Sequence, residues 1–118
     1  MITKIDHIGI AVKSIDDTAK LYRDVLGLKV ENIEVVADQK AKTAIIPVGD
    51  SKIELIESTD PDGTIARFIE SRGEGLHHLA LEVSNIEDSL STLIKKKVAL
   101  IDEKPRKGVE NTSIAFLH

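Results

Sequence analysis

The sequence has 118 residues, 42% of them hydrophobic and 31% charged, which suits one globular domain rather than two independent ones. It has no cysteine, which excludes a disulfide framework, a thiol nucleophile and a cysteine-ligated zinc site. The net charge of −4, the few aromatic residues and the lack of an apolar run of about 20 residues argue against nucleic-acid and membrane partners, so we expect a cytoplasmic protein that acts on a small molecule.

The first half of the chain predicts a strand, a helix and three further strands. The helix has a start signal at Ser14, with Asp17 three positions later, and a stop at Gly27. Residues at helical spacing lie between these signals, namely Ile15, Ala19, Tyr22 and Leu26. Gly49 and Asp50 form a hairpin signal between the last two strands. The predicted strands are Asp6–Val12, Lys29–Val36, Lys42–Val48 and Lys52–Glu57.

The second half of the chain begins with the same plan. The turn residues Asp60–Gly63 and a predicted helix over Thr64–Ser71 form a connector. After it we predict a strand over Leu76–Val83, a helix over Asn85–Lys97, a strand around Val98–Ile101, a charged loop over Asp102–Asn111 and a strand over Thr112–Leu117. The chain is therefore expected to be a single domain of two modules, 1–58 and 75–118, joined by the connector 59–74.

One motif occurs twice, in the first predicted strand of each half. His7-Ile8-Gly9-Ile10-Ala11-Val12 returns as His78-Leu79-Ala80-Leu81-Glu82-Val83, and each copy leads into a helix start. Two equivalent modules can place equivalent side chains around one shared point. We therefore expect His7 and His78 to face each other, and imidazole nitrogen is a preferred ligand for zinc, cobalt, nickel and iron. The alternative is that both histidines are buried, hydrogen-bonded residues with no metal.

Glu54 is a third candidate ligand. Polar and apolar residues alternate over Lys52–Ile56, so Glu54 faces away from its apolar neighbours, toward either solvent or the inside of a cupped sheet. Glu57 falls on the opposite face and is interpreted as a surface or turn residue. His77 points opposite to His78, so only one of that pair can face the site.

The second module has one strand fewer than the first. The position that corresponds to Glu54 in the second copy falls beyond the last residue, His118. We expect a further strand there that carries a fourth ligand, either an acidic residue or its amide. Truncation of the chain is favoured over a shorter variant or completion by a partner chain.

Several segments resemble a known family. Asp6–Val12 and Gly75–Ala80 resemble the paired strands of the vicinal oxygen chelate superfamily, which includes glyoxalase I. A closer resemblance, over nearly the whole chain, is to the methylmalonyl-CoA epimerase family within it. That resemblance rests on the segments Ile53–Glu57, Ile65–Ile69, Arg72–His78, Leu100–Arg106 and Ile114–His118.

The resemblance implies an α+β fold in which tandem βαβββ modules form a cupped mixed sheet around one divalent metal ion, with the last strand missing from this chain. The ion implied is Co²⁺, with Mn²⁺, Ni²⁺ or Zn²⁺ as alternatives, and its ligands would be His7, Glu54 and His78. Glu54 is the candidate catalytic carboxylate among the residues present, while the family's main base is expected beyond residue 118. A second base on the third strand of some epimerases falls near Thr43, which is a poor proton acceptor at neutral pH.

The activity implied is the interconversion of (2R)- and (2S)-methylmalonyl-CoA by proton transfer at C2 through a metal-stabilised enolate. The alternatives are a glyoxalase I-type lactoylglutathione lyase and a metal-free ligand-binding module of the same fold. The partners implied are a small acyl-CoA substrate and a second copy of the chain in a homodimer. Lys104, Arg106 and Lys107 lie in one loop that either meets coenzyme A phosphates or is simply solvated.

Overall fold

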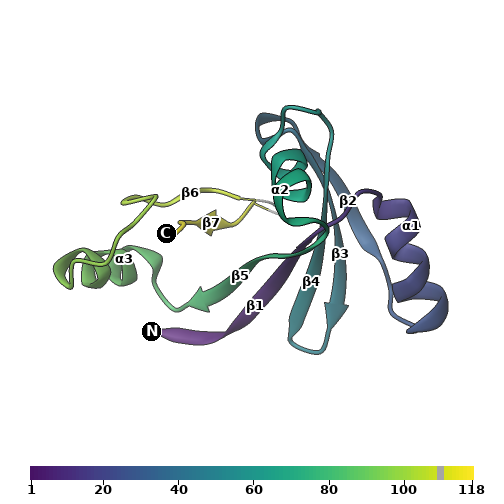
Figure 1. The fold of residues 1–118 in the computed structure, drawn as a ribbon. Coiled ribbons are helices and arrows are strands. Elements are labelled where there is room, and N and C mark those ends of the chain that lie inside the picture. Colours follow the sequence, from purple (N-terminus) through teal and green to yellow (C-terminus); the bar gives the residue numbers. More distant parts are fainter. Residues whose placement is uncertain (109–110) are drawn as a thin grey trace. The chain divides into compact units, whose positions relative to one another are not determined.

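A mixed sheet of five strands organises the chain, whose computed structural model describes residues 1–108 and 111–118. The strand order is β2-β3-β4-β1-β5 (Figure 1). β1 runs parallel to β4, whereas β2 with β3 and β3 with β4 are antiparallel. The strands are β1 (Ile2–Ala11), β2 (Glu31–Val36), β3 (Ala41–Val48), β4 (Ser51–Ser58) and β5 (Gly75–Val83). The expected α+β fold with a mixed sheet is confirmed.

The chain divides into two compact units. The larger unit is Lys4–Leu81, and the smaller combines Met1–Thr3 with Glu82–His118. The larger unit contains α1 (Ile15–Lys20), the π-helical turn η1 (Leu21–Val25), the 3₁₀ turn η2 (Ala37–Gln39) and α2 (Thr64–Arg72). The smaller contains α3 (Ile86–Lys95) and the antiparallel pair β6 (Arg106–Lys107) and β7 (Ser113–Ile114). The module boundaries drawn from the repeat stay a prediction.

The repeat extends to the starts of two helices. The backbone N–H of Asp17 donates to the Ser14 side chain at the start of α1, at 3.1 Å. At the start of α3, the N–H of Asp88 donates to the Asn85 side chain at 3.0 Å. The two caps occupy equivalent positions of the repeat, and each satisfies an N–H that the helix itself leaves unpaired. The capping signal predicted from the sequence is confirmed.

Apolar side chains cover both faces of the sheet in the larger unit. Leu55 on β4 packs with the α1 residue Ile15 on one face. Its neighbour Ile56 packs with the α2 residue Ile65 on the other face. Glu54 is two residues from Ile56 and therefore lies on the face that α2 covers in part. α2 is thus the helix that packs on the face that carries Glu54, whereas α1 packs on the opposite face.

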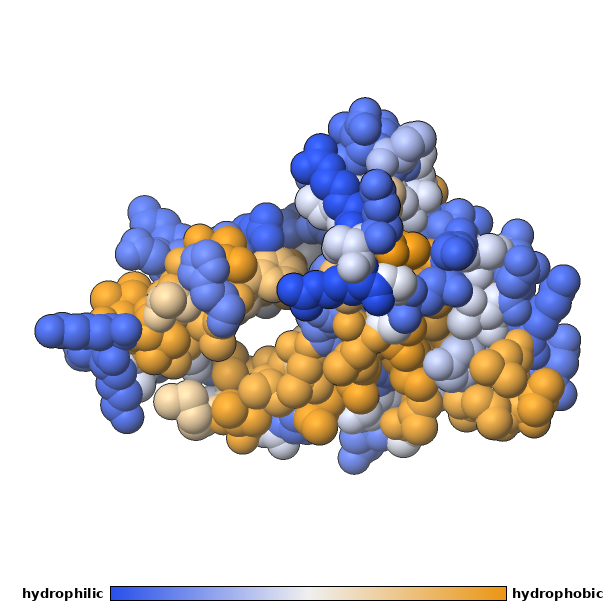
Figure 2. Space-filling model, viewed as in Figure 1, coloured by the Kyte–Doolittle hydropathy of each residue, from blue (hydrophilic) through white to orange (hydrophobic). Residues whose placement is uncertain are grey.

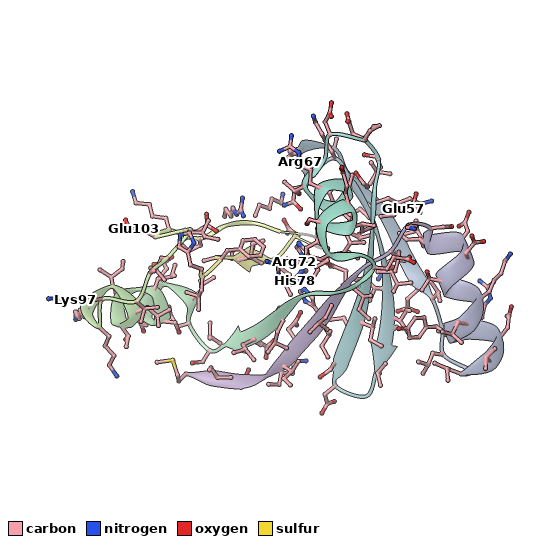
Figure 3. The ribbon with its side chains drawn as sticks, viewed as in Figure 1. Glu57, Arg67, Arg72, His78, Lys97 and Glu103 are labelled. Carbon is pink, nitrogen blue, oxygen red and sulfur yellow. The ribbon has the colours of Figure 1, made fainter. Side chains whose placement is uncertain are left out.

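Glu57 caps α1 rather than facing solvent. Its Oε1 accepts the backbone N–H of Ile15 at 2.7 Å, and the side chain is half-buried (Figure 3). Strand alternation gave the correct face, but the interpretation as a surface or turn residue was wrong. The reason is that α1 begins over this face, so a carboxylate there meets the positive end of the helix.

The end of the second module has less strand than predicted. The expected strand around Val98–Ile101 is reduced to a single bridge between Leu100 and Leu117, and the expected strand over Thr112–Leu117 is reduced to β7. The Asp102 carboxylate accepts the Phe116 N–H at 2.9 Å, and this side-chain bond replaces a ladder bond. The predicted loop contains β6, and its residues 109–110 lie outside the described residues.

Several large hydrophobic side chains are exposed, as the orange areas of Figure 2 show. The turn η1 and the residue after it expose Leu21, Val25 and Leu26. The expected homodimer would have to cover apolar surface of this kind, and it stays a prediction. Within residues 1–108 and 111–118, no helix has the length and apolar character needed to cross a membrane.

Replacing Glu57 with Ala should lower the free energy of unfolding by about 1–2 kcal/mol, because the N–H of Ile15 loses its acceptor at the start of α1. Urea denaturation would show this as a lower midpoint at unchanged slope. Glu31→Ala, at an exposed glutamate of β2, is the control and should change stability by less than about 0.5 kcal/mol. Equal midpoints for the two variants would contradict the capping role.

Candidate metal centre

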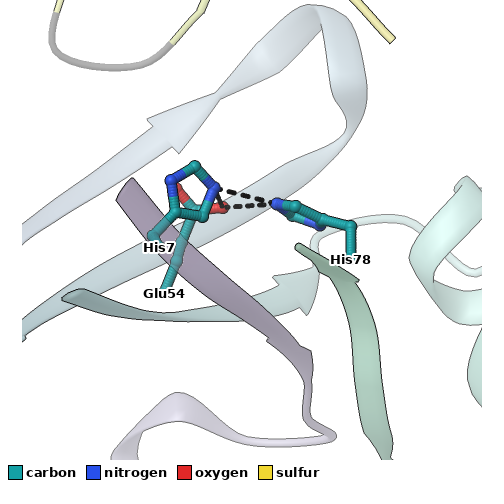
Figure 4. Close-up of side chains that lie close together, drawn as sticks. All are labelled: His7, Glu54 and His78. Atoms are coloured by element: carbon teal, nitrogen blue, oxygen red, sulfur yellow. Dashed lines mark hydrogen bonds and ion pairs between the residues drawn. The ribbon is translucent and has the colours of Figure 1, made fainter. Parts of the chain in front are cut away.

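The first strands of the two repeats bring His7 and His78 together. β1 lies between β4 and β5 in the sheet, so side chains of both neighbours can reach over it. The two Nε2 atoms are 2.9 Å apart, and Oε1 of Glu54 lies 4.0 Å from the first and 3.9 Å from the second (Figure 4). The structure thus brings together the three residues that the sequence proposed as ligands.

Gly9 provides the space for this arrangement. It lies two residues after His7 and pairs directly with Glu54 on β4. A Cβ atom at Gly9 would lie 2.5 Å from Nδ1 and 2.7 Å from Nε2 of His78, which is closer than packed atoms approach. The imidazole of His78 therefore crosses β1 where β1 has no side chain. The backbone of Gly9 has no positive φ, so the constraint is one of space.

Glu54 is a buried carboxylate. The residue pairs with Gly9 on β1 and with Ile45 on β3, and it is only 6% exposed. A charged group in this position is costly unless cations or hydrogen bonds compensate it. Nε2 of His7 lies 4.0 Å from Oε1 of the Glu54 carboxylate, and Nε2 of His78 lies 3.9 Å from it. A cation held between the three groups would add positive charge beside this carboxylate.

Asp6 fixes the orientation of His7. Its Oδ2 lies 2.7 Å from Nδ1 of His7 and 3.7 Å from Nζ of Lys52. Burial alone would raise the pKa of Asp6, but the hydrogen bond from His7 and the charge of Lys52 hold that pKa below its usual value. Asp6 is therefore an ionised acceptor at neutral pH, and Nδ1 of His7 carries the proton. Nε2 of His7 is left as the nitrogen that can bind a metal.

His78 is neutral at physiological pH. Burial, together with the charges of His7 and His77, lowers the pKa of His78 to about 4. A neutral imidazole can act as a ligand without first losing a proton. Burial also lowers the pKa of His77.

His77 contacts the back of the His78 ring. Nδ1 of His77 lies 2.8 Å from Nδ1 of His78, on the side of the ring away from the ligand nitrogen. The Phe68 ring on α2 and the His77 ring form a T-shaped pair, with ring centroids 4.9 Å apart. Strand alternation pointed His77 away from the site and gave it no role. The sequence signal for this contact is the adjacency of the two histidines.

Thr43 lies on the same face as Glu54. It pairs with Ile56, while Glu54 pairs with Ile45, so both side chains project from that face. Thr43 is buried, and its hydroxyl donates to the backbone carbonyl of Glu34 at 3.5 Å. The third strand thus places a hydroxyl where the resemblance suggested a base, and a proton-accepting role for Thr43 stays a prediction.

Arg106 of the basic loop has partners of its own. Arg106 belongs to the smaller unit, where it pairs with Asp102 at 3.2 Å and stacks on Phe116. These contacts give Arg106 a structural partner within its own unit. A contact of Lys104 or Lys107 with coenzyme A stays a prediction, as does the ligand expected beyond His118.

The donor set fits a divalent transition metal. Two imidazole nitrogens and a carboxylate oxygen suit zinc, cobalt and nickel and, less strongly, manganese. The 2.9 Å between the two Nε2 atoms fits neighbouring ligands of one ion with bonds of about 2.1 Å. Among the described residues, these three side chains are close enough together to hold one metal ion, because their ligand atoms all lie within 4.8 Å of one another.

Comparisons with known proteins extend over nearly the whole chain. Residues 6–116 match the Glyoxalase/Bleomycin resistance protein/Dioxygenase superfamily. The uncharacterized protein YqjC of Bacillus subtilis (strain 168) is 41% identical over 114 residues, which are 97% of this chain and 81% of YqjC. The mitochondrial methylmalonyl-CoA epimerase of Mus musculus is 28% identical over 116 residues, 98% of this chain but 65% of the mouse protein. The crystal structure of methylmalonyl-CoA epimerase from Mycobacterium tuberculosis has a TM-score of 0.93 and 34% identity, and the match covers 99% of this chain and 79% of that one.

Replacing Gly9 with Ala should displace the His78 ring, because the added methyl group occupies the same space. We expect the ¹⁵N signals of the His7 and His78 imidazoles to shift while the far-UV circular dichroism stays unchanged. Ala80→Gly is the reciprocal change in the second copy of the repeat and should leave both imidazole signals in place. Unshifted imidazole signals in Gly9→Ala would contradict the crowding.

Proposed function

Because the chain belongs to the glyoxalase/bleomycin resistance protein/dioxygenase superfamily, we propose that it is a metal-dependent methylmalonyl-CoA epimerase. Homologous epimerases at 28% and 34% identity support an epimerase function at the level of the family. The observation that carries the proposal is the convergence of His7, Glu54 and His78 on one point of a sheltered face. These residues would hold Co²⁺, with Mn²⁺, Ni²⁺ or Zn²⁺ as alternatives.

The reaction requires control of negative charge. Removing the proton at C2 of a malonyl thioester places charge on the thioester oxygen, and such an anion forms too slowly in water. A bound divalent ion supplies positive charge beside the oxygens on which that charge develops. The residues around the site hold its ligands in place before the substrate arrives: Asp6 orients His7, and Gly9 admits His78.

Epimerisation also requires groups that move a proton on and off C2. Among the described residues, Glu54 is the carboxylate in the group of candidate ligands. We therefore assign to Glu54 the role of accepting the proton from C2. Thr43 lies on the same face and would orient substrate or water through its hydroxyl rather than accept a proton.

Two other functions fit parts of the site. A glyoxalase I-type lyase would use the same two histidines and carboxylate, because it also stabilises an anion formed next to a carbonyl group. A metal-free binding module would need none of them, and the buried Glu54 beside two imidazoles argues against it. The substrate and the dependence on metal separate the three.

Incubation with (2R)-methylmalonyl-CoA in deuterated water should introduce deuterium at C2. A chelator should abolish this exchange, and added Co²⁺ should restore it, as followed by mass spectrometry. Formation of lactoylglutathione from methylglyoxal and glutathione would instead favour the lyase. Absence of exchange both with and without added Co²⁺ would refute the epimerase.

Replacing His78 with Ala should weaken Co²⁺ binding by more than about 100-fold, because loss of a ligand costs more than loss of a ligand's partner. Competition with a chromophoric chelator measures the affinity, and the visible absorption of Co²⁺ reports its coordination. His118→Ala, at an exposed histidine of the smaller unit, is the control and should bind Co²⁺ as the parent does. Unchanged affinity in His78→Ala would remove His78 from the ligand set.

A further inference from the structure

Four side chains form a continuous chain of hydrogen bonds across β1 and β5. Oδ2 of Asp6 lies 2.7 Å from Nδ1 of His7, whose Nε2 lies 2.9 Å from Nε2 of His78. Nδ1 of His78 in turn lies 2.8 Å from Nδ1 of His77. Each of these contacts needs one hydrogen atom between two atoms that otherwise repel each other.

The hydrogen positions follow from Asp6, which can only accept. Nδ1 of His7 must donate to it, so the Nε2 atom of a neutral His7 accepts. Nε2 of His78 then has to donate, the Nδ1 atom of a neutral His78 accepts, and Nδ1 of His77 donates. Without a metal, the hydrogen of His78 therefore lies on the nitrogen that a metal would need.

Binding a metal at Nε2 of His78 requires the opposite tautomer. The hydrogen leaves Nε2, and the ring carries one on Nδ1 instead. That N–H needs an acceptor, and Nδ1 of His77 is 2.8 Å away. His77 accepts once its own hydrogen lies on Nε2 rather than Nδ1. Both rings keep one hydrogen each, so the rearrangement releases no proton.

We propose that His77 is a positioning residue of the metal centre: it accepts the Nδ1–H of His78 and thereby holds Nε2 of His78 as a metal ligand. This inference rests on the proposed metal site and assigns a role to a residue outside the ligand set. Outer partners of this kind fix the tautomer and orientation of a ligand histidine.

The internal repeat supports the assignment independently. His77 immediately precedes His78 in the second copy, just as Asp6 immediately precedes His7 in the first. In each copy, this preceding residue contacts Nδ1 of the histidine, at 2.7 Å in the first copy and 2.8 Å in the second. The same backbone position thus supplies the partner in both modules, a carboxylate in one and an imidazole in the other.

The connector helix holds His77 in place. Phe68 on α2 forms a T-shaped ring pair with His77, and the guanidinium of Arg72 lies 5.8 Å from the centre of the Phe68 ring. α2 is anchored in turn by Ile65, which is buried in the core. The orientation of His77, and through it that of His78, therefore depends on a helix that carries none of the ligands.

The test compares three variants at position 77. His77→Phe keeps an aromatic ring but has no acceptor, and it should weaken Co²⁺ binding by about 10- to 100-fold. His77→Asn places an amide oxygen close to the former Nδ1, and His77→Asp copies the partner found in the first module. Both should bind Co²⁺ within about threefold of the parent affinity, while urea midpoints confirm that all three variants are folded.

Long-range ¹H–¹⁵N spectra of the Zn²⁺-loaded protein give a second measurement. His78 should show a metal-bound Nε2 and a protonated Nδ1 in the parent and in His77→Asn, and altered signals in His77→Phe. Parent-like affinity in His77→Phe would overturn the inference, as would equal losses in all three variants, which indicate packing alone. Failure of the parent itself to bind Co²⁺ or Zn²⁺ would overturn the metal site together with this inference.

Discussion

Gly9 is the position at which the imidazole of His78 crosses β1, and the candidate centre depends on the space that its missing side chain leaves. The sheet order puts β1 between β4 and β5, so ligands from three strands can converge only above β1 itself. A side chain at Gly9 would separate His78 from both His7 and Glu54. Sheet topology brings the strands together, but the glycine determines that their side chains meet.

The buried charge of Glu54 is the second constraint on the site. A carboxylate on a sheltered face is stable only when positive charge or donated hydrogen bonds compensate the loss of water. Nε2 of His7 and Nε2 of His78 share one hydrogen along their own contact and lie 4.0 and 3.9 Å from Oε1 of Glu54. A divalent cation bound by all three residues would add positive charge beside the carboxylate and would stabilise the folded state by mass action. The same arrangement therefore connects stability with the proposed chemistry.

The parts of the fold and site that could be predicted from the sequence are those marked by a repeated or alternating residue pattern. The repeat predicted the facing histidines, and the spacing of Ser14 and Asp17 predicted the helix cap. Strand alternation separated the face of Glu54 from that of Glu57. Alternation does not say what covers a face, so the position of α1 over Glu57 could not be foreseen. The Asp102 side chain takes a hydrogen bond from Phe116 that a strand would have used, and this too depends on tertiary contacts. The crossing of His78 over Gly9 requires the register of the strands, which no local pattern specifies.

The two copies of the repeat share a histidine and differ in the residues around it. Asp6 gives His7 a charged partner, which strengthens the imidazole as a donor to a cation, whereas His77 gives His78 a neutral one. Gly9 leaves room for a ring, whereas Ala80 at the equivalent position carries a methyl group. The modules are therefore no longer interchangeable: His7 is held rigidly by its own strand, and His78 is held through His77 by the connector helix. The candidate centre therefore has a charged outer partner beside one histidine and an imidazole partner beside the other.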